Sequence, residues 1–394
     1  MSGPRILTFS SLFPNSEQRH HGLFVAERLH HLLTSSAIET RVIAPVPWFP
    51  FRHPLFGGYS QKARIPLQEN RAGITVYHPR YPLLPKVGMT LAPLLMARAM
   101  ENHLQRLIQE GWDFDLIDAH YFYPDGVAAM MLGKKFQKPV VITGRGTDLN
   151  LIPKHPLPRQ MIQWAAREAA ACITVCQALK ERLMGLGIGE ERVTVLRNGV
   201  DLTRFTLPPR GAVATIYKKP GRTTLLSVGH LIPRKGHDLI LRALVDLPQA
   251  DLIIIGQGGE KQKLRALAEV LGIRDRVSFP GAVSHSELKH YYRAADALVL
   301  ASDREGWANV LLEAMACGTP VIATPVWGTP EVVNTPAAGV LMHERSPQAL
   351  VAAYQKLFAA YPDPQATRRH AEGFSWQATS RGQLDLFERV LQKG

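Results

Sequence analysis

Short apolar runs alternate with longer segments of helical period along most of this chain. In its first half, apolar runs with the length of buried strands occupy residues 5–9, 40–44, 74–77, 116–119, 140–143, 172–175 and 193–196. Segments with apolar residues three and four positions apart lie between them, at residues 22–33, 89–108, 126–135 and 158–169. Such alternation is typical of parallel sheets with helices on both faces.

The second half of the chain repeats the pattern. Its predicted strands are residues 224–228, 252–255, 277–279, 297–300, 320–323 and 339–341. Between the halves, residues 206–222 are rich in Pro, Gly and Lys and have no clear period, so they are the best candidate for a linker. The predicted fold class is therefore α/β, with two doubly wound Rossmann-like domains. Ligands of such sheets bind at the carboxyl ends of the strands, so we expect the site in a central cleft between the domains.

Length and composition agree with two globular domains. A chain of 394 residues is too long for one ordinary core, and 46% hydrophobic with 20% charged residues is neither disordered nor membranous. No apolar run approaches the roughly 20 residues that span a bilayer, and the N-terminus enters a strand without a signal segment. Cys172, Cys176 and Cys317 lie in apolar stretches and are expected to be buried free thiols. We therefore expect a cytoplasmic protein.

The net charge of +13 is unevenly distributed. The first hundred residues hold eleven Lys and Arg against four Glu, which places +7 there. No nucleic-acid-binding motif accompanies this charge, so we expect no nucleic-acid partner but a phosphorylated ligand or an anionic membrane surface. Residues 48–52, Trp-Phe-Pro-Phe-Arg, combine aromatic and basic groups that suit lipid headgroups. We expect peripheral binding to the cytoplasmic membrane face; the alternative is a loop folded over a ligand pocket.

Two carboxylates eight positions apart mark the most informative segment. Glu305 precedes a predicted helix, Glu313 lies inside it, and the helix ends at Gly318. Eight residues return nearly to the same helix face, and the backbone N–H groups near Ala308 and Asn309 can hold an anion or a sugar oxygen. The neighbours of Glu313 are small or apolar, so this carboxylate is predicted to be buried, where it needs a partner or a ligand. No basic partner is evident in the sequence.

This segment resembles the Glu-x7-Glu signature of glycosyltransferase family 4, a family of retaining enzymes with the GT-B fold. The resemblance covers nearly the whole chain, is most specific over residues 193–205 and 224–333, and is weakest over residues 45–110. It implies transfer of a sugar from a UDP- or GDP-sugar to a glycan or lipid-linked acceptor, in polysaccharide or glycolipid biosynthesis. The nucleotide-sugar is then a co-substrate, and no cofactor is expected.

The resemblance also implies a division of labour between the domains. Residues 1–205 would form the acceptor-binding domain, and a C-terminal helix at residues 375–394 would pack back on it. Residues 206–374, which begin with the linker, would form the domain that binds the nucleotide-sugar.

Residues 227–236 read Ser-Val-Gly-His-Leu-Ile-Pro-Arg-Lys-Gly and lead from a strand into a helix. Lys235 stands at the helix start, where its ammonium group and the helix dipole suit a diphosphate. The segment resembles the family element Gly-Arg-Leu-x-x-x-Lys-Gly, which implies a phosphate-binding and catalytic role for Lys235. His230 stands where the family has arginine, and either binds the donor or is structural. Arg234 either supplies the missing charge or points to solvent.

Further donor contacts follow from the same resemblance. Glu305 and His120 would orient the donor sugar as catalytic residues, and Glu313 would hold the ribose. His120 ends a predicted strand, although a structural histidine remains the alternative. The donor-binding set is completed by four residues that match the family pattern, namely Gly22, Gly306, Asn309 and Val310. At Gly22, the missing side chain would let the backbone approach a phosphate closely.

Residues 143–148, Thr-Gly-Arg-Gly-Thr-Asp, follow the next predicted strand. Arg145 and Asp148 could bind hydroxyls or phosphate of the acceptor. The alternative, which stays open, is a turn held by two glycines.

No metal is expected in the active site. Asp113 and Asp115 form an Asp-x-Asp pattern, which binds metal in the other large glycosyltransferase fold, but here it only introduces a strand. The paired histidines His20-His21 and His30-His31 do not face one site, because adjacent residues on a helix point in different directions.

Two other function classes stay open. A sugar-nucleotide epimerase uses the same fold without an acceptor, and products formed from the donor alone would distinguish it. A weakly catalytic nucleotide-sugar-binding subunit is favoured by His230 in place of arginine, and donor binding without turnover would support it.

Overall fold

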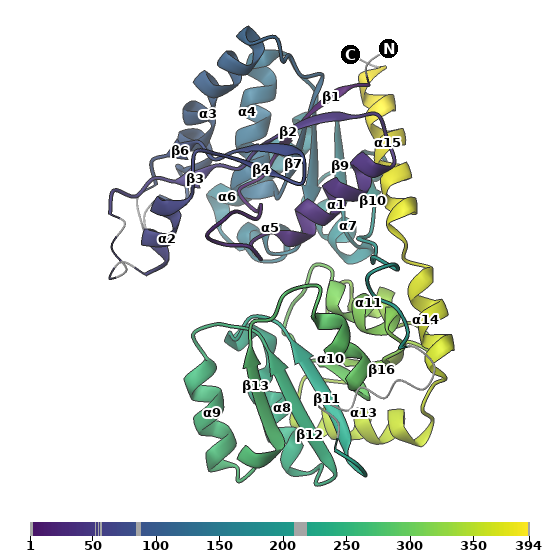
Figure 1. The fold of residues 1–394 in the computed structure, drawn as a ribbon. Coiled ribbons are helices and arrows are strands. Elements are labelled where there is room, and N and C mark those ends of the chain that lie inside the picture. The colour runs from purple at the N-terminus through teal and green to yellow at the C-terminus, as the bar shows by residue number, and fades with distance from the viewer. Residues whose placement is uncertain are drawn as a thin grey trace. The chain divides into compact units, whose positions relative to one another are not determined.

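The computed structural model describes residues 3–51, 53, 55, 57–83, 88–208 and 219–392. The chain divides into two compact units, one made of Met1–Arg197 with Gln377–Gly394 and the other of Asn198–Trp376. Each unit has a mainly parallel sheet between layers of helices (Figure 1). The predicted fold class, two doubly wound Rossmann-like α/β domains, is confirmed.

Within the described residues, the first unit has an eight-stranded sheet in the order β10-β9-β8-β7-β1-β2-β5-β4. Its strands are β1 (Arg5–Phe9), β2 (Glu39–Ile43), β4 (Gln68–Arg71), β5 (Ile74–Tyr77), β7 (Leu116–His120), β8 (Val140–Gly144), β9 (Ala171–Thr174) and β10 (Val193–Val195). Neighbouring strands are parallel except β4 and β5. Two short strands, β3 (Val46–Pro47) and β6 (Arg80–Tyr81), pair with each other outside this sheet.

Helices cover both faces of the first sheet. On one face, α1 (Leu23–Thr34) and α15 (Trp376–Leu391) join the strands in one apolar core cluster, to which Leu29 and Phe387 belong. On the other face lie α3 (Ala92–Gln109), α4 (Val127–Phe136) and α6 (Pro156–Glu168) (Figure 1). The shorter helices are α2 (Gly58–Arg64), α5 (Thr147–Asn150) and α7 (Gln177–Met184).

The second unit has a six-stranded sheet in the order β13-β12-β11-β14-β15-β16, in which every described pair is parallel. Its strands are β11 (Thr223–Val228), β12 (Ala250–Ile255), β13 (Val277–Gly281), β14 (Ala297–Leu300), β15 (Val321–Ala323) and β16 (Gly339–Leu341). All residues of β12 are buried, as expected for a parallel strand covered on both faces. Strand order reverses between β11 and β14 here, and between β1 and β7 in the first sheet.

The core of the second unit lies mainly under three helices. These are α8 (His237–Val245), α9 (Lys261–Val270) and α13 (Pro347–Ala359), whose apolar faces form one cluster with the strands. Outside this cluster, α10 (Leu288–Ala294) contacts β11, and α11 (Asn309–Ala316) contacts β14 and β15. The remaining helices are α12 (Thr329–Val332) and α14 (Pro364–Glu372).

Four of the elements that the sequence pattern missed lie within residues 45–110, namely α2, β3, β4 and β6. The pattern also missed the short helices α5 and α7 of the first unit. Strand β4 has the sequence Gln-Glu-Asn-Arg, so it offers no apolar signal, and β3 and β6 are only two residues long. Elsewhere the predicted bounds shift by a few residues, as in the helix predicted at 89–108 and observed at Ala92–Gln109.

The second unit begins at Asn198, earlier than the predicted boundary after residue 205. The reason is local packing, because the buried ring of Phe205 lies against Tyr292 and His285, 5.9 and 5.3 Å between centroids. Arg368 also donates from Nη1 to the Phe205 carbonyl at 2.5 Å. Residues 209–218 of the predicted linker, and 393–394 of the predicted C-terminal helix, lie outside the described residues. Separate acceptor and donor roles for the two units stay a prediction.

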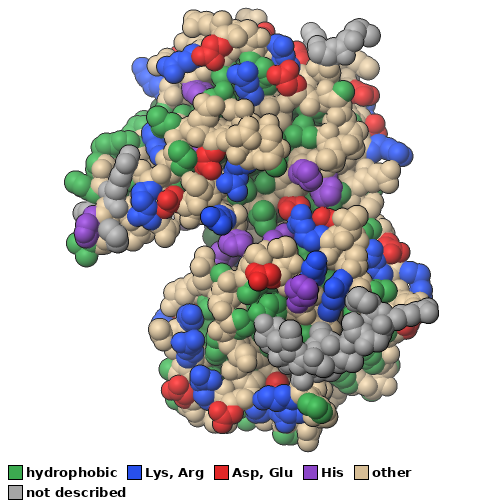
Figure 2. Space-filling view, viewed as in Figure 1, with side chains coloured by type: hydrophobic (Ala, Val, Ile, Leu, Met, Phe, Trp, Pro, Cys, Tyr) green, Lys and Arg blue, Asp and Glu red, His purple; other side chains and the backbone are tan. Residues whose placement is uncertain are grey.

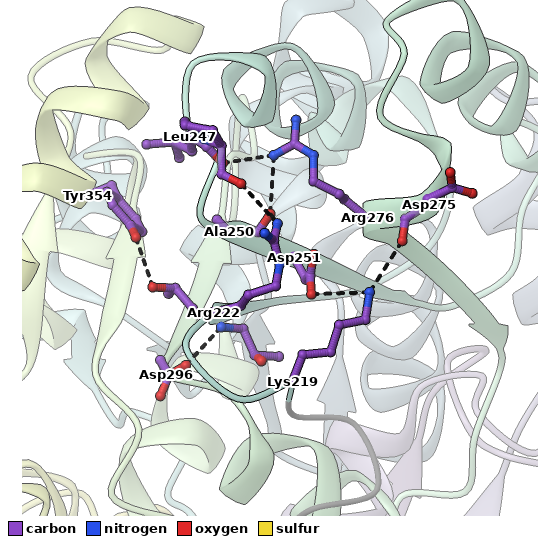
Figure 3. Close-up of polar contacts among 12 residues, drawn as sticks. Lys219, Arg222, Leu247, Ala250, Asp251, Asp275, Arg276, Asp296 and Tyr354 are labelled. Atoms are coloured by element: carbon purple, nitrogen blue, oxygen red, sulfur yellow. Dashed lines mark hydrogen bonds and ion pairs between the residues drawn. The ribbon is translucent and has the colours of Figure 1, made fainter.

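A polar cluster closes the amino-terminal edge of the second sheet (Figure 3). Arg222 donates from Nε to Asp251 Oδ1 at 3.0 Å and from Nη2 to the Pro248 carbonyl at 3.0 Å. Lys219 approaches the same Asp251 carboxylate, with 3.4 Å between Nζ and Oδ2. Arg276 Nη1 donates to the Leu247 carbonyl at 2.8 Å. These contacts satisfy carbonyl groups at the ends where the strands begin.

Substitution of Arg222 by alanine should lower the free energy of unfolding by about 1–3 kcal/mol, because it removes the donor to Asp251 Oδ1 and to the Pro248 carbonyl. Urea unfolding measures the effect. Arg242→Ala is the matched control, because Arg242 is an exposed arginine on α8. Equal unfolding midpoints for the two variants would contradict the proposed role of Arg222.

Candidate functional site

The loops that follow β11 and β14 meet where the strand order of the second sheet reverses. They are residues 229–236 and 301–308, and they leave the sheet on opposite sides of the reversal. The Asp303 amide donates to the Arg234 carbonyl at 2.9 Å and joins the two loops. In parallel sheets of this order, the reversal is where ligands bind outside the carboxyl ends of the strands.

Lys235 and Glu305 form an ion pair at this point. Lys235 Nζ lies 2.5 Å from Glu305 Oε1, and Arg234 Nη1 lies 3.5 Å from Oε2 of the same carboxylate. Glu305 is buried, and burial alone would raise its pKa, but Lys235 and Arg234 outweigh this effect and hold the pKa below its usual range. Arg234 also donates to the Arg304 carbonyl at 2.6 Å, so its side chain turns toward this site rather than away from it.

Gly236 allows the two loops to pack together. It follows the short 3-10 turn Pro233–Lys235 and has a left-handed backbone with φ of 67°. A Cβ atom at this position would lie 2.2 Å from the Ala301 carbonyl oxygen, so only glycine fits. The close approach of these loops therefore depends on one glycine.

Glu313 lies on the buried side of α11 and has two partners that the sequence did not reveal. Tyr292 donates its hydroxyl to Oε2 at 2.8 Å, and His285 Nε2 lies 2.9 Å from Oε1. Arg204 donates to Nδ1 of His285 at 2.8 Å, and arginine cannot accept, so the His285 proton lies on Nε2 and is donated to Glu313. Burial, together with the Glu313 charge, raises the pKa of Tyr292 well above its usual range. His285 comes from a distant loop, which is why no basic partner of Glu313 was evident in the sequence.

The other predicted donor residues of this segment surround the start of α11. Gly306, Asn309 and Val310 are half-buried. Asn309 accepts a hydrogen bond from the Asn198 amide, with 3.2 Å between Oδ1 and Nδ2. Ala308, the N-cap residue, has no polar side chain with which to cap the first turn.

His230 and His237 differ sharply in environment. His230 is exposed, and its carbonyl oxygen lies 3.3 Å from Nε2 of the buried His237. Nδ1 of His237 lies 3.1 Å from Ser227 Oγ. Burial lowers the pKa of His237 to about 4, so its imidazole is neutral at neutral pH. Through these contacts with Ser227 and the His230 carbonyl, His237 stabilises the loop that carries Lys235. Its position in the sequence did not reveal this role.

In the first unit, His120 is enclosed at the carboxyl end of β7. It is only 1% exposed; Nε2 lies 3.2 Å from Asp118 Oδ2, and Arg145 donates from Nη2 to Nδ1 at 2.7 Å. Because arginine cannot accept, the His120 proton lies on Nε2, toward Asp118. Burial lowers the pKa of His120; Asp118 opposes this shift, and Arg145 adds to it. Each ring nitrogen of His120 therefore has a protein partner.

Asp148 and Gly22 both make contacts that stabilise the local backbone conformation of their loops. Asp148 is buried, and its carboxylate accepts backbone N–H groups of Phe122 at 2.8 Å and Gly146 at 2.7 Å. The carboxylate of Asp148 therefore holds the turn that also carries Arg145. Gly22 is buried with φ of 64°, and a Cβ there would lie 2.3 Å from the carbonyl oxygen of Leu12. The close approach that Gly22 permits is to Leu12 of its own loop.

Within the residues that the structure describes, no group of three or more His, Cys, Asp or Glu is arranged to hold a metal ion. Asp113 pairs with Lys138, with 2.9 Å between Oδ1 and Nζ. Asp115 accepts the backbone N–H of Arg5 at 2.7 Å. Both carboxylates of the Asp-x-Asp pattern therefore have partners within the protein.

Both units match known families. Residues 25–204 match the family described as Glycosyltransferase Family 4, and residues 214–373 match the one described as Glycosyl transferases group 1. The chain therefore belongs to the family 4 type of glycosyltransferases. Across the part of this glycosyltransferase that the structure describes, no helix combines the length and apolar character needed to cross a bilayer.

Relatives of this glycosyltransferase align with much of its length. A D-inositol 3-phosphate glycosyltransferase of Mycolicibacterium gilvum is 30% identical over 71% of this chain and 66% of the relative. One of Xylanimonas cellulosilytica is 28% identical over 86% of this chain and 87% of the relative.

Solved structures share its fold. Sucrose-phosphate synthase from Thermosynechococcus elongatus superimposes with a TM-score of 0.82 at 19% identity, over 99% of this chain and 100% of that one. Anabaena HepE in complex with UDP superimposes with a TM-score of 0.72 at 19% identity, over 98% of this chain and 100% of that one.

His237→Gln should reduce the loss of stability on acidification. The unfolded chain takes up a proton on this histidine near pH 6.5 and the folded protein only near 4, so the unfolded state holds more protons in between and stability falls as the pH falls. Between pH 7 and pH 5 this group accounts for about 2 kcal/mol, which the variant should not lose. Urea unfolding at both pH values measures the difference. The exposed His343→Gln is the control, and the same pH dependence in both variants would contradict a neutral, buried His237.

Proposed function

We propose that this chain is a retaining, metal-independent glycosyltransferase that moves a sugar from a UDP- or GDP-sugar to a glycan or lipid-linked acceptor. The observation that carries the proposal is the meeting of Lys235, Arg234 and Glu305 at the strand-order reversal of the second sheet. Support comes from the family match of both units. It also comes from structural neighbours that were solved in complex with UDP-glucose, or bound to ADP and acarbose.

In the proposed reaction, Lys235 and Arg234 offset the negative charge that grows on the departing diphosphate. Lys235 already pairs with Glu305, so the diphosphate would be a second anion beside this ammonium group. The N–H groups at the start of α11, beside Gly306, Asn309 and Val310, add favourable dipoles. These groups together make a metal ion unnecessary, and no cofactor is needed besides the nucleotide-sugar.

Glu305 and Glu313 bind different parts of the nucleotide-sugar donor in this proposal. Glu305 orients hydroxyls of the donor sugar, while Glu313 accepts hydrogen bonds from the ribose. His285 and Tyr292 each contact one oxygen of Glu313 and hold the carboxylate in place. Each carboxylate oxygen has a second lone pair, so these contacts leave Glu313 able to bind a ligand hydroxyl. His230 completes the donor set as an exposed residue on the Lys235 loop.

In the first unit, we propose Arg145 as the acceptor-binding residue. Its planar guanidinium suits sugar hydroxyls or a phosphate group. D-inositol 3-phosphate, after which these relatives are named, combines both kinds of group. Asp148 holds the turn that carries Arg145. The donor-side roles that the family resemblance implies for His120 and Gly22 stay proposals.

We also propose reversible binding to an anionic membrane surface on the cytoplasmic side. Trp48 and Phe51 are 56% and 55% exposed, and Leu55 is 84% exposed. Figure 2 shows hydrophobic side chains gathered over the part of the first unit that carries α2 in Figure 1. Exposed aromatic groups in a unit with excess positive charge suit a headgroup region. Arg52, the basic residue of the predicted motif, lies outside the described residues.

Lys235→Ala and Glu313→Gln should each weaken nucleotide binding about tenfold to a hundredfold, because each removes charge-assisted hydrogen bonds. A thermal-shift panel of UDP, GDP, ADP and their sugars identifies the nucleotide, which should stabilise the protein by about 2.7 kcal/mol at a hundred times its Kd. Calorimetry then gives the affinity of each variant. Lys263→Ala, in which the lost side chain is 76% exposed, is the matched control and should bind like the wild type.

Equal affinities in all of these variants would contradict the donor site. Transfer is followed in EDTA by NMR of the anomeric signals, with a donor-only sample to detect epimerisation. An inverted product would overturn retention, and loss of transfer that magnesium or manganese restores would overturn metal independence.

The Trp48→Ala/Phe51→Ala double variant should sediment less with anionic vesicles than the wild type, because it removes two exposed aromatic anchors. Wild-type binding should weaken at high salt, where charge attraction is screened. Leu157→Ala is the control, because Leu157 is an exposed apolar residue elsewhere on the same unit. Binding that is equal for anionic and neutral vesicles, or equal in all variants, would remove the membrane proposal and leave the transferase proposal intact.

A further inference from the structure

A glutamine interrupts the buried stripe of α15. Leu386, Phe387 and Val390 are buried in the core of the first unit, and Gln383, one turn earlier on the same face, is only 1% exposed. Burial of a side-chain amide is unfavourable unless its donor and acceptor groups are satisfied. The position therefore points to a specific polar partner beneath α15.

Gln383 has two such partners, and both come from far away in the sequence. Its Nε2 donates to Asp118 Oδ2 at 2.9 Å, and its Oε1 accepts from Arg28 Nε at 2.7 Å. The orientation of the amide is unambiguous, because arginine can only donate and an ionised carboxylate can only accept. Arg28 is held in turn by the Leu196 carbonyl, 3.0 Å from its Nη1.

Gln383 and His120 bind the same oxygen of Asp118. His120 Nε2 lies 3.2 Å from Oδ2, while Oδ1 is buried and accepts no hydrogen bond from the described residues. The rotation of the carboxylate about its own bond is therefore set by Gln383 on one side and His120 on the other. Beyond His120, the contact at Nδ1 is the Arg145 guanidinium.

We infer that Gln383 is a positioning residue, which acts through Asp118 and His120 to hold Arg145 in place for the acceptor. The sequence of contacts is Gln383, Asp118, His120 and Arg145, with hydrogen bonds at each step. Asp118 keeps the His120 proton on Nε2, which leaves Nδ1 as the acceptor that Arg145 requires. The returning helix α15 thereby takes part in acceptor binding without touching the acceptor. The acceptor part of this inference rests on the proposed function, whereas the tautomer part does not.

The test compares Gln383→Met with Gln377→Met. The first variant keeps the volume but removes both hydrogen bonds, and the second removes an exposed glutamine from the same helix. Both proteins are labelled with 15N-histidine, and the His120 signals are assigned by their loss in His120→Gln. The wild type and Gln377→Met should show His120 protonated on Nε2, while Gln383→Met should show a mixture of tautomers. Unchanged His120 signals in Gln383→Met would overturn the inference.

Kinetics provide the second readout. Gln383→Met should raise the KM for the acceptor about tenfold, which corresponds to the loss of one hydrogen bond to a charged group. A fall in kcat with unchanged acceptor KM would overturn the positioning of Arg145. If the wild-type chain transfers no sugar, the proposed function fails, and the NMR comparison still decides whether Gln383 sets the tautomer.

A further variant covers the case in which Gln383→Met does not fold. Gln383→Glu keeps the acceptor for Arg28 but replaces the donor to Asp118 by a carboxylate, so it should give the same mixture of His120 tautomers. A wild-type pattern in this variant would also overturn the inference.

Discussion

The carboxyl ends of parallel strands meet at one edge of a sheet, and the reversal of strand order sends neighbouring loops to opposite faces there. This constraint decides where the chain can assemble charged groups. In the second unit it brings together Lys235 and Glu305, which are 70 residues apart in sequence and 2.5 Å apart in space. In the first unit the loop after β1 meets the end of β7 in the same way, where Ser10 Oγ donates to the His120 carbonyl at 3.3 Å. The remaining polar contacts of both sites are built around these two meeting points.

Burial at these edges makes each charged group dependent on its partner. Desolvation alone would raise the pKa of Glu305 and of Asp118, yet the pKa of each lies below its usual value. Lys235 and Arg234 outweigh burial at Glu305, and His120, Arg28 and Arg145 outweigh it at Asp118. Removing one partner would leave an uncompensated buried charge, which is strongly destabilising. The residues proposed for donor binding are therefore also part of the folded structure. For this reason, variants at these positions need a stability measurement beside each activity measurement.

The chain passes from the first unit to the second after Arg197 and returns after Trp376. Shortly after the first passage, Phe205 packs on Tyr292, which also binds Glu313, so the segment that enters the second unit supports its candidate site. After the return, α15 brings Gln383 into the first unit and against Asp118. In both places, the segment that enters a unit contributes a residue that supports a buried carboxylate. Phe205 supports Glu313 through Tyr292, and Gln383 binds Asp118 directly. The fold and the candidate chemistry are connected through these supporting residues.

The sequence by itself determined the fold class, the strand that ends at His120, and the strands whose following loops carry Lys235 and Glu305, because burial imposes a period that can be read along the chain. It did not reveal β4, whose residues are all polar, or the close packing at Gly22 against Leu12. Only the tertiary structure decided which groups become partners, as for Glu313 with His285 and Asp118 with Gln383, 28 and 265 positions apart. Periodicity reports whether a side chain is buried, whereas hydrogen-bond partners depend on the path of distant segments, which no local pattern contains.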